Sequence, residues 1–293
     1  MTSMQGNIPL KRPQTLSVAI PASLVSDVPH LREKTMKIGL IGRALATFRV
    51  DEVIVYPDIS SQRQLRDIEL ITTILAYLET PQYLRKHLFK IRPELRYSGI
   101  LPPLRTPHHP LRSSEKDLAM GEFREGVIIS QQKNGVLVDI GVERPALVVG
   151  ENISKNTRVT VKIIEKGKQL KAQLVKSEDI QEYWGYKVIV SNKPLGRMLK
   201  ERHFDMVIAT SRFGKPFTEV VEEICQKWKE SKTVCIAFGA PTRGLYEIVK
   251  HENLNLPDLA DFIVNVIPDQ ATETIRTEEA LYATLAVLNI MTS

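Results

Sequence analysis

The stretch "TVCIAFGAPTRGLYEIVK", residues 233–250, decides the fold of the chain around it. It begins with an apolar, β-branched run that predicts a short buried strand. A glycine and a proline then break this run. Apolar side chains return at helical spacing over residues 243–250, which predicts a helix. A strand, a tight turn and a helix in this order are typical of one repeating unit of an α/β sheet.

The same alternation recurs on both sides of this stretch. The chain before it has two predicted strands, each followed by a helix; Ser26 or Asp27 could cap the first helix, and Leu65 lies on the apolar face of the second. The predicted strands cover residues 16–20, 51–57, 186–190, 205–211, 233–239 and 261–268, and the later predicted helices cover 194–203, 217–230, 243–250 and 276–291. Alternating strands and helices favour a parallel sheet.

The sequence pattern changes between the N-terminal and C-terminal stretches of alternating strands and helices. Five prolines, at positions 93, 102, 103, 107 and 110, exclude a helix and predict an extended connection. Residues 126–150 and 157–175 then show short β-branched runs separated by glycine turns, which predicts a small antiparallel β-barrel of the OB type. We therefore expect one α/β domain, residues 1–95 and 181–293, interrupted by a barrel at residues 96–180. Three independent pieces are the alternative.

Composition restricts the class of protein. The chain has 293 residues, of which 43% are hydrophobic and 25% charged, as in globular proteins. No segment approaches the roughly 20 apolar residues of a membrane span. The N-terminal residues lack the pattern of a secretion signal, and Cys225 and Cys235 are expected to be buried reduced thiols. These features predict a cytoplasmic protein.

Positive charge is segregated along the chain. The formal net charge is +6, but residues 82–116 alone carry +6 and residues 151–176 carry +5, so the remainder is −5. A polyanion-binding surface requires such segregation, because phosphate contacts dominate affinity for nucleic acids. A solvated charged face would also explain either stretch taken alone.

Three loops follow predicted strands in the C-terminal part: "ATSRFGKP" (209–216), "FGAPTRG" (238–244) and "NVIPDQATETIRTEEA" (265–280). Ligands of open α/β sheets bind beyond the carboxyl ends of the strands, so we expect these loops to share one crevice. Neither a phosphate-binding P-loop nor a dinucleotide fingerprint is present. Ordinary turns, with Thr272, Thr274 or Thr277 capping the last helix, are the plainer interpretation.

The pair "AFGAPTRGLYEI" and "NVIPDQATETIRTEEALYATLAVLN", in this order, resembles the SPOUT RNA methyltransferases. The branch with an OB-like insertion, found in archaea and eukaryotes, is most similar, and the likeness extends to "VAIPASL" near the start. "IRTEEA" also resembles the "LRTETA" signature of SPOUT enzymes that methylate a uridine ring nitrogen in ribosomal RNA. The resemblance implies a C-terminal trefoil knot, S-adenosylmethionine as cofactor, a homodimer and RNA as the partner.

Site residues are carried over by the same resemblance. Family members often have glycine at the position of Ala271, and the added methyl group could restrict the approach of this backbone to a ligand. The residues implied to bind the cofactor are Thr210, Ser211, Gly239, Arg243, Gly244, Ile267, Gln270, Thr272 and Ile275.

Catalytic and RNA-binding residues are also implied. Arg43 and Arg276 could clamp phosphates, and Glu279, or its neighbour Glu278, could act as the base, although both acids could equally complement a helix dipole. Methyl transfer requires no metal, and His108 and His109 are expected to form a surface pair. The expected RNA contacts are Lys166, Lys168, Lys171, Arg105 and Arg112.

The sequence therefore predicts a methyltransferase that acts on ribosomal RNA. The alternative is an RNA-binding assembly factor that keeps the fold and has lost catalysis, for which Ala271 is a small indication. A nucleotide hydrolase is disfavoured by the missing phosphate loop.

Overall fold

The computed structural model describes residues 8–59 and 62–292. These residues form two compact units: residues 8–11, 79–93 and 104–185 make up the first, and residues 12–78, 94–103 and 186–292 the second. The boundaries differ from those expected, since residues 79–93 belong to the barrel unit. Tyr83 explains this assignment, because its hydroxyl donates a hydrogen bond to the carbonyl oxygen of Glu125 at 2.8 Å.

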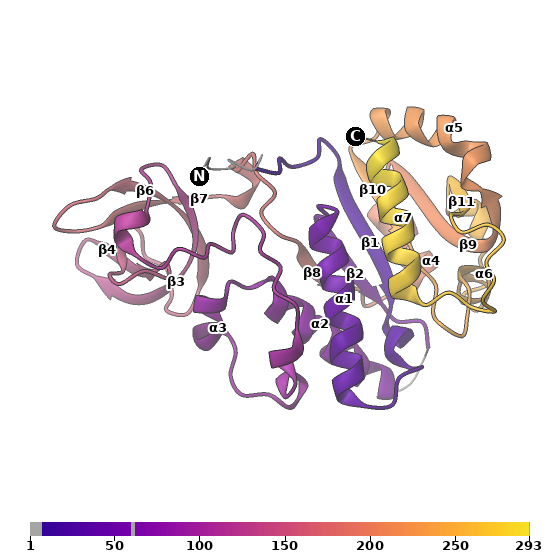
Figure 1. The fold of residues 1–293 in the computed structure, drawn as a ribbon, viewed down its shortest axis with the longest axis horizontal. Helices are drawn as coiled ribbons and strands as arrows, with labels where there is room; N and C mark the ends of the chain where they lie inside the picture. Colours follow the sequence, from indigo (N-terminus) through magenta and orange to yellow (C-terminus); the bar gives the residue numbers. More distant parts are fainter. Residues whose placement is uncertain (1–7, 60–61, 293) are drawn as a thin grey trace, which may run out of the picture. The chain divides into compact units, whose positions relative to one another are not determined.

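The second unit is built on a six-stranded sheet with the order β11-β9-β10-β1-β2-β8 (Figure 1). All neighbouring strands pair in parallel, which confirms the predicted parallel α/β sheet. The strands are β1 (Thr15–Pro21), β2 (Glu52–Tyr56), β8 (Lys187–Val190), β9 (Met206–Pro216), β10 (Thr233–Ala237) and β11 (Phe262–Asn265).

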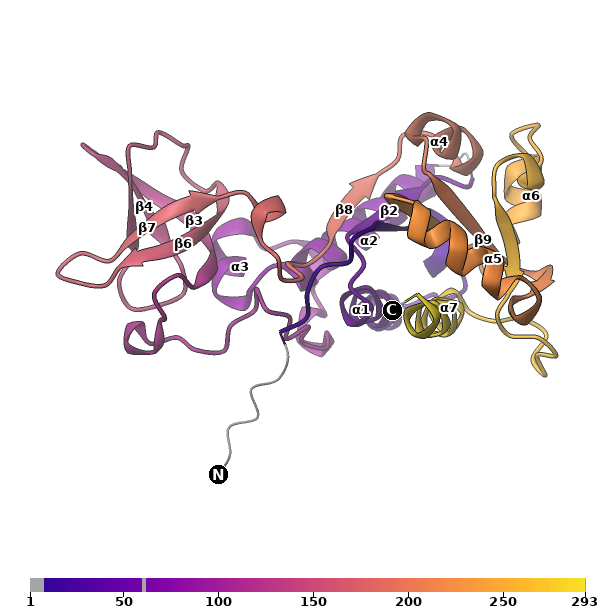
Figure 2. The same ribbon diagram turned by 90° about the horizontal axis from the view of Figure 1, so that it is seen from above.

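Helices cover both faces of this sheet. They are α1 (Leu31–Thr47), α2 (Gln62–Glu79), α4 (Leu195–Arg202), α5 (Phe217–Glu230), α6 (Leu245–Lys250) and α7 (Thr277–Met291). Figure 2 shows α1 and α7 on one side and α4 and α6 on the other. The core beneath α4 and α6 joins sheet residues such as Ala19 and Cys235 to Leu199 and Ile248. None of the helices between residues 8 and 59 or 62 and 292 is long and apolar enough to cross a membrane.

Several local expectations, about a helix cap and about the burial of single residues, were wrong. α1 begins at Leu31 without a side-chain cap, and Asp27 instead pairs with Lys37 at 2.8 Å. Leu65 on α2 is 68% exposed, because the buried face of that helix runs through Gln64, Ile68 and Ile71. Cys235 is buried as expected, but Cys225 is partly exposed.

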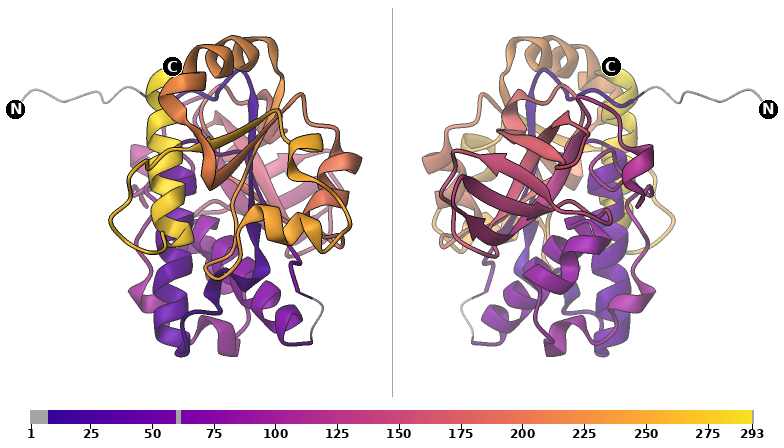
Figure 3. Two further views of the ribbon diagram at one scale, coloured as in Figure 1. Left: turned by 90° about the vertical axis from the view of Figure 1, so that its right-hand side faces the viewer. Right: turned by 90° about the vertical axis from the view of Figure 1, so that its left-hand side faces the viewer.

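The first unit contains a closed five-stranded barrel (Figure 3, right-hand view). Its strands are β3 (Phe123–Gln132), β4 (Gly135–Asp139), β5 (Ala146–Val149), β6 (Arg158–Glu165) and β7 (Lys171–Val175), and the short helix α3 (Gln82–Leu88) precedes them. Inward-facing side chains such as Ile128, Val138 and Val161 fill the interior. An antiparallel barrel was expected, but one of its strand pairs, β5 with β7, is parallel.

A buried ionic network lies inside this unit. Arg158 binds Glu79 and Glu125, each at 2.6 Å, so one of the basic residues counted toward the expected polyanion surface is paired internally. His108 is fully buried at 3.1 Å from the Glu79 carboxylate, which contradicts the expected surface pair. Burial alone would raise the pKa of Glu79, but Arg158 and His108 outweigh it and hold that pKa at about 2.

Candidate functional site

A pocket lies beyond the carboxyl ends of β9, β10 and β11. Its volume is about 340 Å3, and all three predicted loops line it. This convergence follows from the sheet order, since β9 has β10 and β11 as its two neighbours and all run in parallel. Eight of the nine residues expected to bind the cofactor line the pocket: Thr210, Ser211, Gly239, Arg243, Gly244, Ile267, Gln270 and Ile275.

The first wall of the pocket is an irregular part of β9. Ile263 of β11 pairs with Ala209, but the next residue, Val264, pairs with Lys215. Residues 210–214 are therefore extra on the β9 side and bulge outward, although β9 as a whole continues through what was expected to be a loop. Thr210 ties this bulge to the sheet by donating its hydroxyl to the carbonyl oxygen of Ala237 at 3.0 Å.

The second wall is the turn between β10 and α6. It is closed by a backbone hydrogen bond from Ala240 to Arg243 at 2.9 Å. A side chain at Gly239 would meet the turn's own backbone at 3.1 Å, so this glycine keeps the turn compact. A Cβ at Gly244 would meet nothing within 4 Å, which leaves the backbone open toward the pocket.

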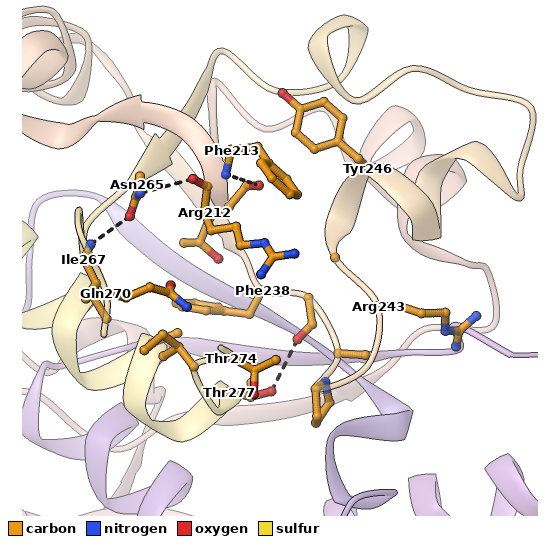
Figure 4. A pocket seen from close by; sticks show the side chains of 18 of the residues that line it. Arg212, Phe213, Phe238, Arg243, Tyr246, Asn265, Ile267, Gln270, Thr274 and Thr277 are labelled. Atoms are coloured by element: carbon orange, nitrogen blue, oxygen red, sulfur yellow. Dashed lines mark hydrogen bonds between the residues drawn. The ribbon is translucent and has the colours of Figure 1, made fainter. Parts of the chain in front are cut away.

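Arg243 has a structural partner that the sequence did not indicate. Its guanidinium is bound to the Asp58 carboxylate at 2.8 Å, and Figure 4 shows the side chain directed away from the other labelled pocket residues. The Asp58 side chain is completely buried. We infer that Arg243 holds the turn in place and that its backbone faces the pocket.

The third wall is the segment between β11 and α7. Asn265 accepts a hydrogen bond from the Ile267 backbone at 3.0 Å, and Gln270 donates to the carbonyl oxygen of Thr272 at 2.8 Å. Thr272 is the expected cofactor residue that does not line the pocket. Thr277 begins α7 and donates to the carbonyl oxygen of Gly239 at 3.3 Å, so it joins the second and third walls and does not cap the helix.

The pocket is also lined by side chains that were not among the expected site residues, and four of them carry a charge or an exposed aromatic ring beside one. Arg212 and Phe213 belong to the β9 bulge, and the guanidinium carbon of Arg212 lies 4.7 Å from the Phe213 ring centre. Glu247 and Glu273 are the pocket's carboxylates. The signal for the first pair was an arginine beside an aromatic residue in a loop that the sequence had already singled out.

The three expected catalytic residues do not line the pocket. Arg43 donates to the carbonyl oxygen of Pro103 at 2.7 Å. Arg276 precedes α7, and its backbone N–H donates to the Glu279 carboxylate at 2.9 Å, so Glu279 caps this helix. Glu278 is buried 3.4 Å from Lys37. Glu279 thus has a capping contact and Glu278 an ion-pair contact, and the role of either acid as the base stays a prediction.

The expected RNA contacts all belong to the barrel unit. Lys166 donates to the carbonyl oxygen of Leu118 at 2.5 Å, and Lys171 pairs with Glu165 at 2.8 Å. Lys168 lines a shallow depression on the barrel. Arg105 and Arg112 are exposed.

Comparison with known proteins identifies the family. The sequence profile of the family described as "Putative RNA methyltransferase" matches residues 15–288. The chain belongs to this family. The prediction of an RNA methyltransferase, an enzyme that transfers methyl groups to RNA, is thereby confirmed.

Relatives of this RNA methyltransferase occur in archaea and animals. An uncharacterised protein of Halobacterium salinarum is 35% identical over 94% of this chain and 99% of its own length. Two proteins named 28S rRNA (uridine-N(3))-methyltransferase are similar over 94% of this chain: that of Drosophila melanogaster is 34% identical over 62% of its length, and that of Homo sapiens is 32% identical over 78% of its length. A methylase family protein from Neisseria gonorrhoeae, with a solved structure, has a TM-score of 0.36 and 10% identity.

Proposed function

We propose that this RNA methyltransferase uses S-adenosylmethionine to methylate the N3 nitrogen of a uridine in ribosomal RNA. The observation that carries the proposal is the extent of the likeness to the animal relatives named for that reaction, which includes all three pocket walls and the barrel. The resemblance of "IRTEEA" to the signature of uridine-methylating enzymes supports the same target.

The pocket residues suit the proposed cofactor. The volume of the pocket, about 340 Å3, lies within the usual range for small-molecule sites. The open backbone at Gly244 permits close approach of a ligand. Ile267 and Ile275 supply apolar surface for a purine ring, and Gln270 and Ser211 supply hydrogen-bonding groups. These residues would hold the cofactor.

The chemistry requires positioning more than it requires an acid or a metal. When bound, S-adenosylmethionine would supply a methyl group on a positively charged sulfur, which would keep the electron pair of the carbon–sulfur bond as the methyl group passed to nitrogen. The role of the pocket walls would be to position the acceptor for this transfer. The N3 proton must leave first, and Glu247 and Glu273 are carboxylates at the pocket that could take it.

The finer architecture belongs to the same proposal. We propose a SPOUT-type sheet with a trefoil knot among residues 181–292 and an OB-type barrel as the RNA-binding insertion. A homodimer is supported by apolar side chains on one face of α1, where Met36 is 50% and Leu40 42% exposed. Sedimentation of the purified protein tests the dimer.

The function is tested by incubating the protein with methyl-labelled S-adenosylmethionine and unmodified ribosomal RNA made by transcription. Nucleoside mass spectrometry should detect 3-methyluridine. Gly244→Trp should fill the pocket and abolish both transfer and binding of S-adenosylhomocysteine, the reaction product. Gly99→Trp is the matched control, since this glycine also has no atom within 4 Å of an added Cβ and does not line the pocket. Normal cofactor binding without any methylated nucleoside would contradict the proposed reaction.

A further inference from the structure

Phe213 is an exposed aromatic residue at the pocket. Its side chain lines the pocket, yet the residue is 72% exposed. Exposing a phenylalanine forfeits the stabilisation that its burial would contribute. Such a residue at the edge of a ligand site is a candidate for contact with that ligand.

The backbone that carries Phe213 is held from three sides. Its N–H donates to the Ser211 hydroxyl at 3.1 Å. Asn265 donates to the carbonyl oxygen of the preceding residue at 3.2 Å. The following residue, Gly214, lies so close to β11 that an added Cβ would be 2.6 Å from the backbone of Val264. The bulge therefore holds the backbone from which the ring projects.

Arg212 gives this ring a charged neighbour. Its guanidinium donates to the carbonyl oxygen of Glu273 at 3.1 Å and lies over the Phe213 ring at 4.7 Å. The hydrogen bond goes to a neutral oxygen, so it does not neutralise the positive charge. Figure 4 shows the guanidinium extending into the pocket beside the Phe213 ring.

The uracil base of the proposed RNA substrate is flat and becomes anionic when N3 loses its proton. An exposed aromatic ring beside a guanidinium group suits such a base. Exposed aromatic side chains stack on nucleobases, and guanidinium groups stabilise anions. We propose that Phe213 is the stacking platform for the target base of the RNA and that Arg212 stabilises the negative charge on this base. When N3 loses its proton to water or to a pocket carboxylate, its electron pair is shared with the two ring carbonyl oxygens, and a guanidinium beside the base stabilises this charge. The inference rests on the proposed function, since it names the acceptor subsite of the same pocket.

Transfer kinetics provide the first test. Phe213→Ala should lower kcat/KM for unmodified ribosomal RNA by about 10- to 100-fold, the range expected when one base stack is removed. Phe213→Trp should retain most activity. Arg212→Gln should lower kcat and shift its pH dependence upward, because the base is then harder to deprotonate. Leu65→Ala is the matched control, an apolar residue that is 68% exposed and lies outside the pocket.

A binding measurement separates this proposal from the proposed function. The native tryptophans, Trp184 and Trp228, are buried, so Phe213→Trp adds an exposed fluorophore, with Leu65→Trp as its control. Short oligouridylate, added with saturating S-adenosylhomocysteine, should quench the fluorescence at position 213 and leave that at position 65 unchanged. This result would support the platform even if no methyl transfer were detected.

Three outcomes would overturn the proposal. An active enzyme in which Phe213→Ala changes nothing would remove the residue from the site. Quenching by S-adenosylhomocysteine alone, with weaker cofactor binding in Phe213→Ala, would assign the ring to the cofactor's adenine. A change of oligomeric state in Phe213→Ala would assign it to an interface between two copies of the chain.

Discussion

The carboxylate of Asp58 joins three segments of the chain beside the pocket. It accepts hydrogen bonds from the Ser23 backbone at 3.0 Å and from Gln64 at 2.9 Å, and it pairs with Arg243 at 2.8 Å. "VAIPASL" and "FGAPTRG", two of the stretches that carry the family resemblance, are thus connected through one buried anion. A buried charge of this kind is tolerated only with a complete set of partners.

Asp58→Asn tests this connection. Removing the charge leaves Arg243 without its ion-pair partner and should lower the free energy of unfolding by about 3 kcal/mol. Affinity for S-adenosylhomocysteine should fall as the turn loosens. Denaturant unfolding and calorimetric titration measure the two effects, and Glu33→Gln at an exposed position of α1 is the control. If the variant is destabilised but its affinity for S-adenosylhomocysteine is unchanged, Asp58 stabilises the fold without affecting the pocket.

His109 predicts a pH dependence of stability. Burial, together with the neighbouring His108, lowers its pKa from 6.5 to about 3. Below pH 6.5 the unfolded chain therefore binds a proton at this residue, whereas the folded chain binds it only near pH 3. The free energy of unfolding therefore decreases as the pH is lowered through this window, by up to about 1.4 kcal/mol per pH unit.

His109→Gln should remove this component, because an amide does not titrate in this range, and the Gln amide can still donate to the carbonyl oxygen of Glu79 that contacts His109 Nε2. Denaturant unfolding at pH 7, 6 and 5 measures the slope, before most carboxylates titrate. Equal slopes in the two proteins would show that His109 is already charged when folded.

At the scale of elements, the discontinuity between β9 and β11 builds the first pocket wall. The pairing jumps from Ala209 to Lys215 on one strand while the other advances by a single residue. Bulges of this kind redirect side chains next to functional sites. Here the displaced segment carries both Arg212 and Phe213.

Gly214→Ala should disturb this wall. The added methyl group would lie 2.6 Å from the Val264 backbone, and the strain should cost about 1–3 kcal/mol of stability. Methyl transfer should fall further than stability alone explains, because Phe213 moves with the bulge. Thermal unfolding and transfer assays compare it with Gly99→Ala, which adds its methyl group in open space. Full activity would show that the bulge is not needed in this form.

At the scale of the whole molecule, the pocket and the residues expected to bind RNA belong to different units. The sheet unit contains the pocket, and the barrel unit contains the lysines expected to bind RNA. Attraction to phosphate is long-ranged and tolerant of position, whereas methyl transfer requires precise placement.

Replacing Lys166, Lys168 and Lys171 with Glu should therefore weaken RNA binding and leave S-adenosylhomocysteine binding unchanged. The slope of log affinity against log salt should decrease by about 0.7–0.9 for each RNA phosphate that the variant no longer neutralises. The control changes the same net charge at exposed lysines of the other unit, Lys200, Lys229 and Lys232. An equal effect in both variants would mean that overall charge, and not the barrel, attracts the RNA.

Local patterns were sufficient for the elements and for the place of the site. Hydrophobic periodicity is a property of neighbouring residues, so β10 and α6 could be read directly from "TVCIAFGAPTRGLYEIVK". Parallel strands direct their carboxyl ends to one edge, so the shared crevice followed from the order of strand and helix. The helix α3, short and close to prolines, carried too weak a pattern to be predicted.

Side-chain partners are the part that only tertiary structure decided. Nothing near Arg243 in the sequence indicates Asp58, and nothing near Glu79 indicates Arg158, because these partners are 185 and 79 residues away. For the same reason the burial of His108, whose partner Glu79 is 29 residues away, and the position of Arg212, which donates to Glu273 61 residues away, were not predicted. Periodicity determines which face of an element is apolar, but the partner of a charge depends on which distant segments the fold brings within hydrogen-bonding distance.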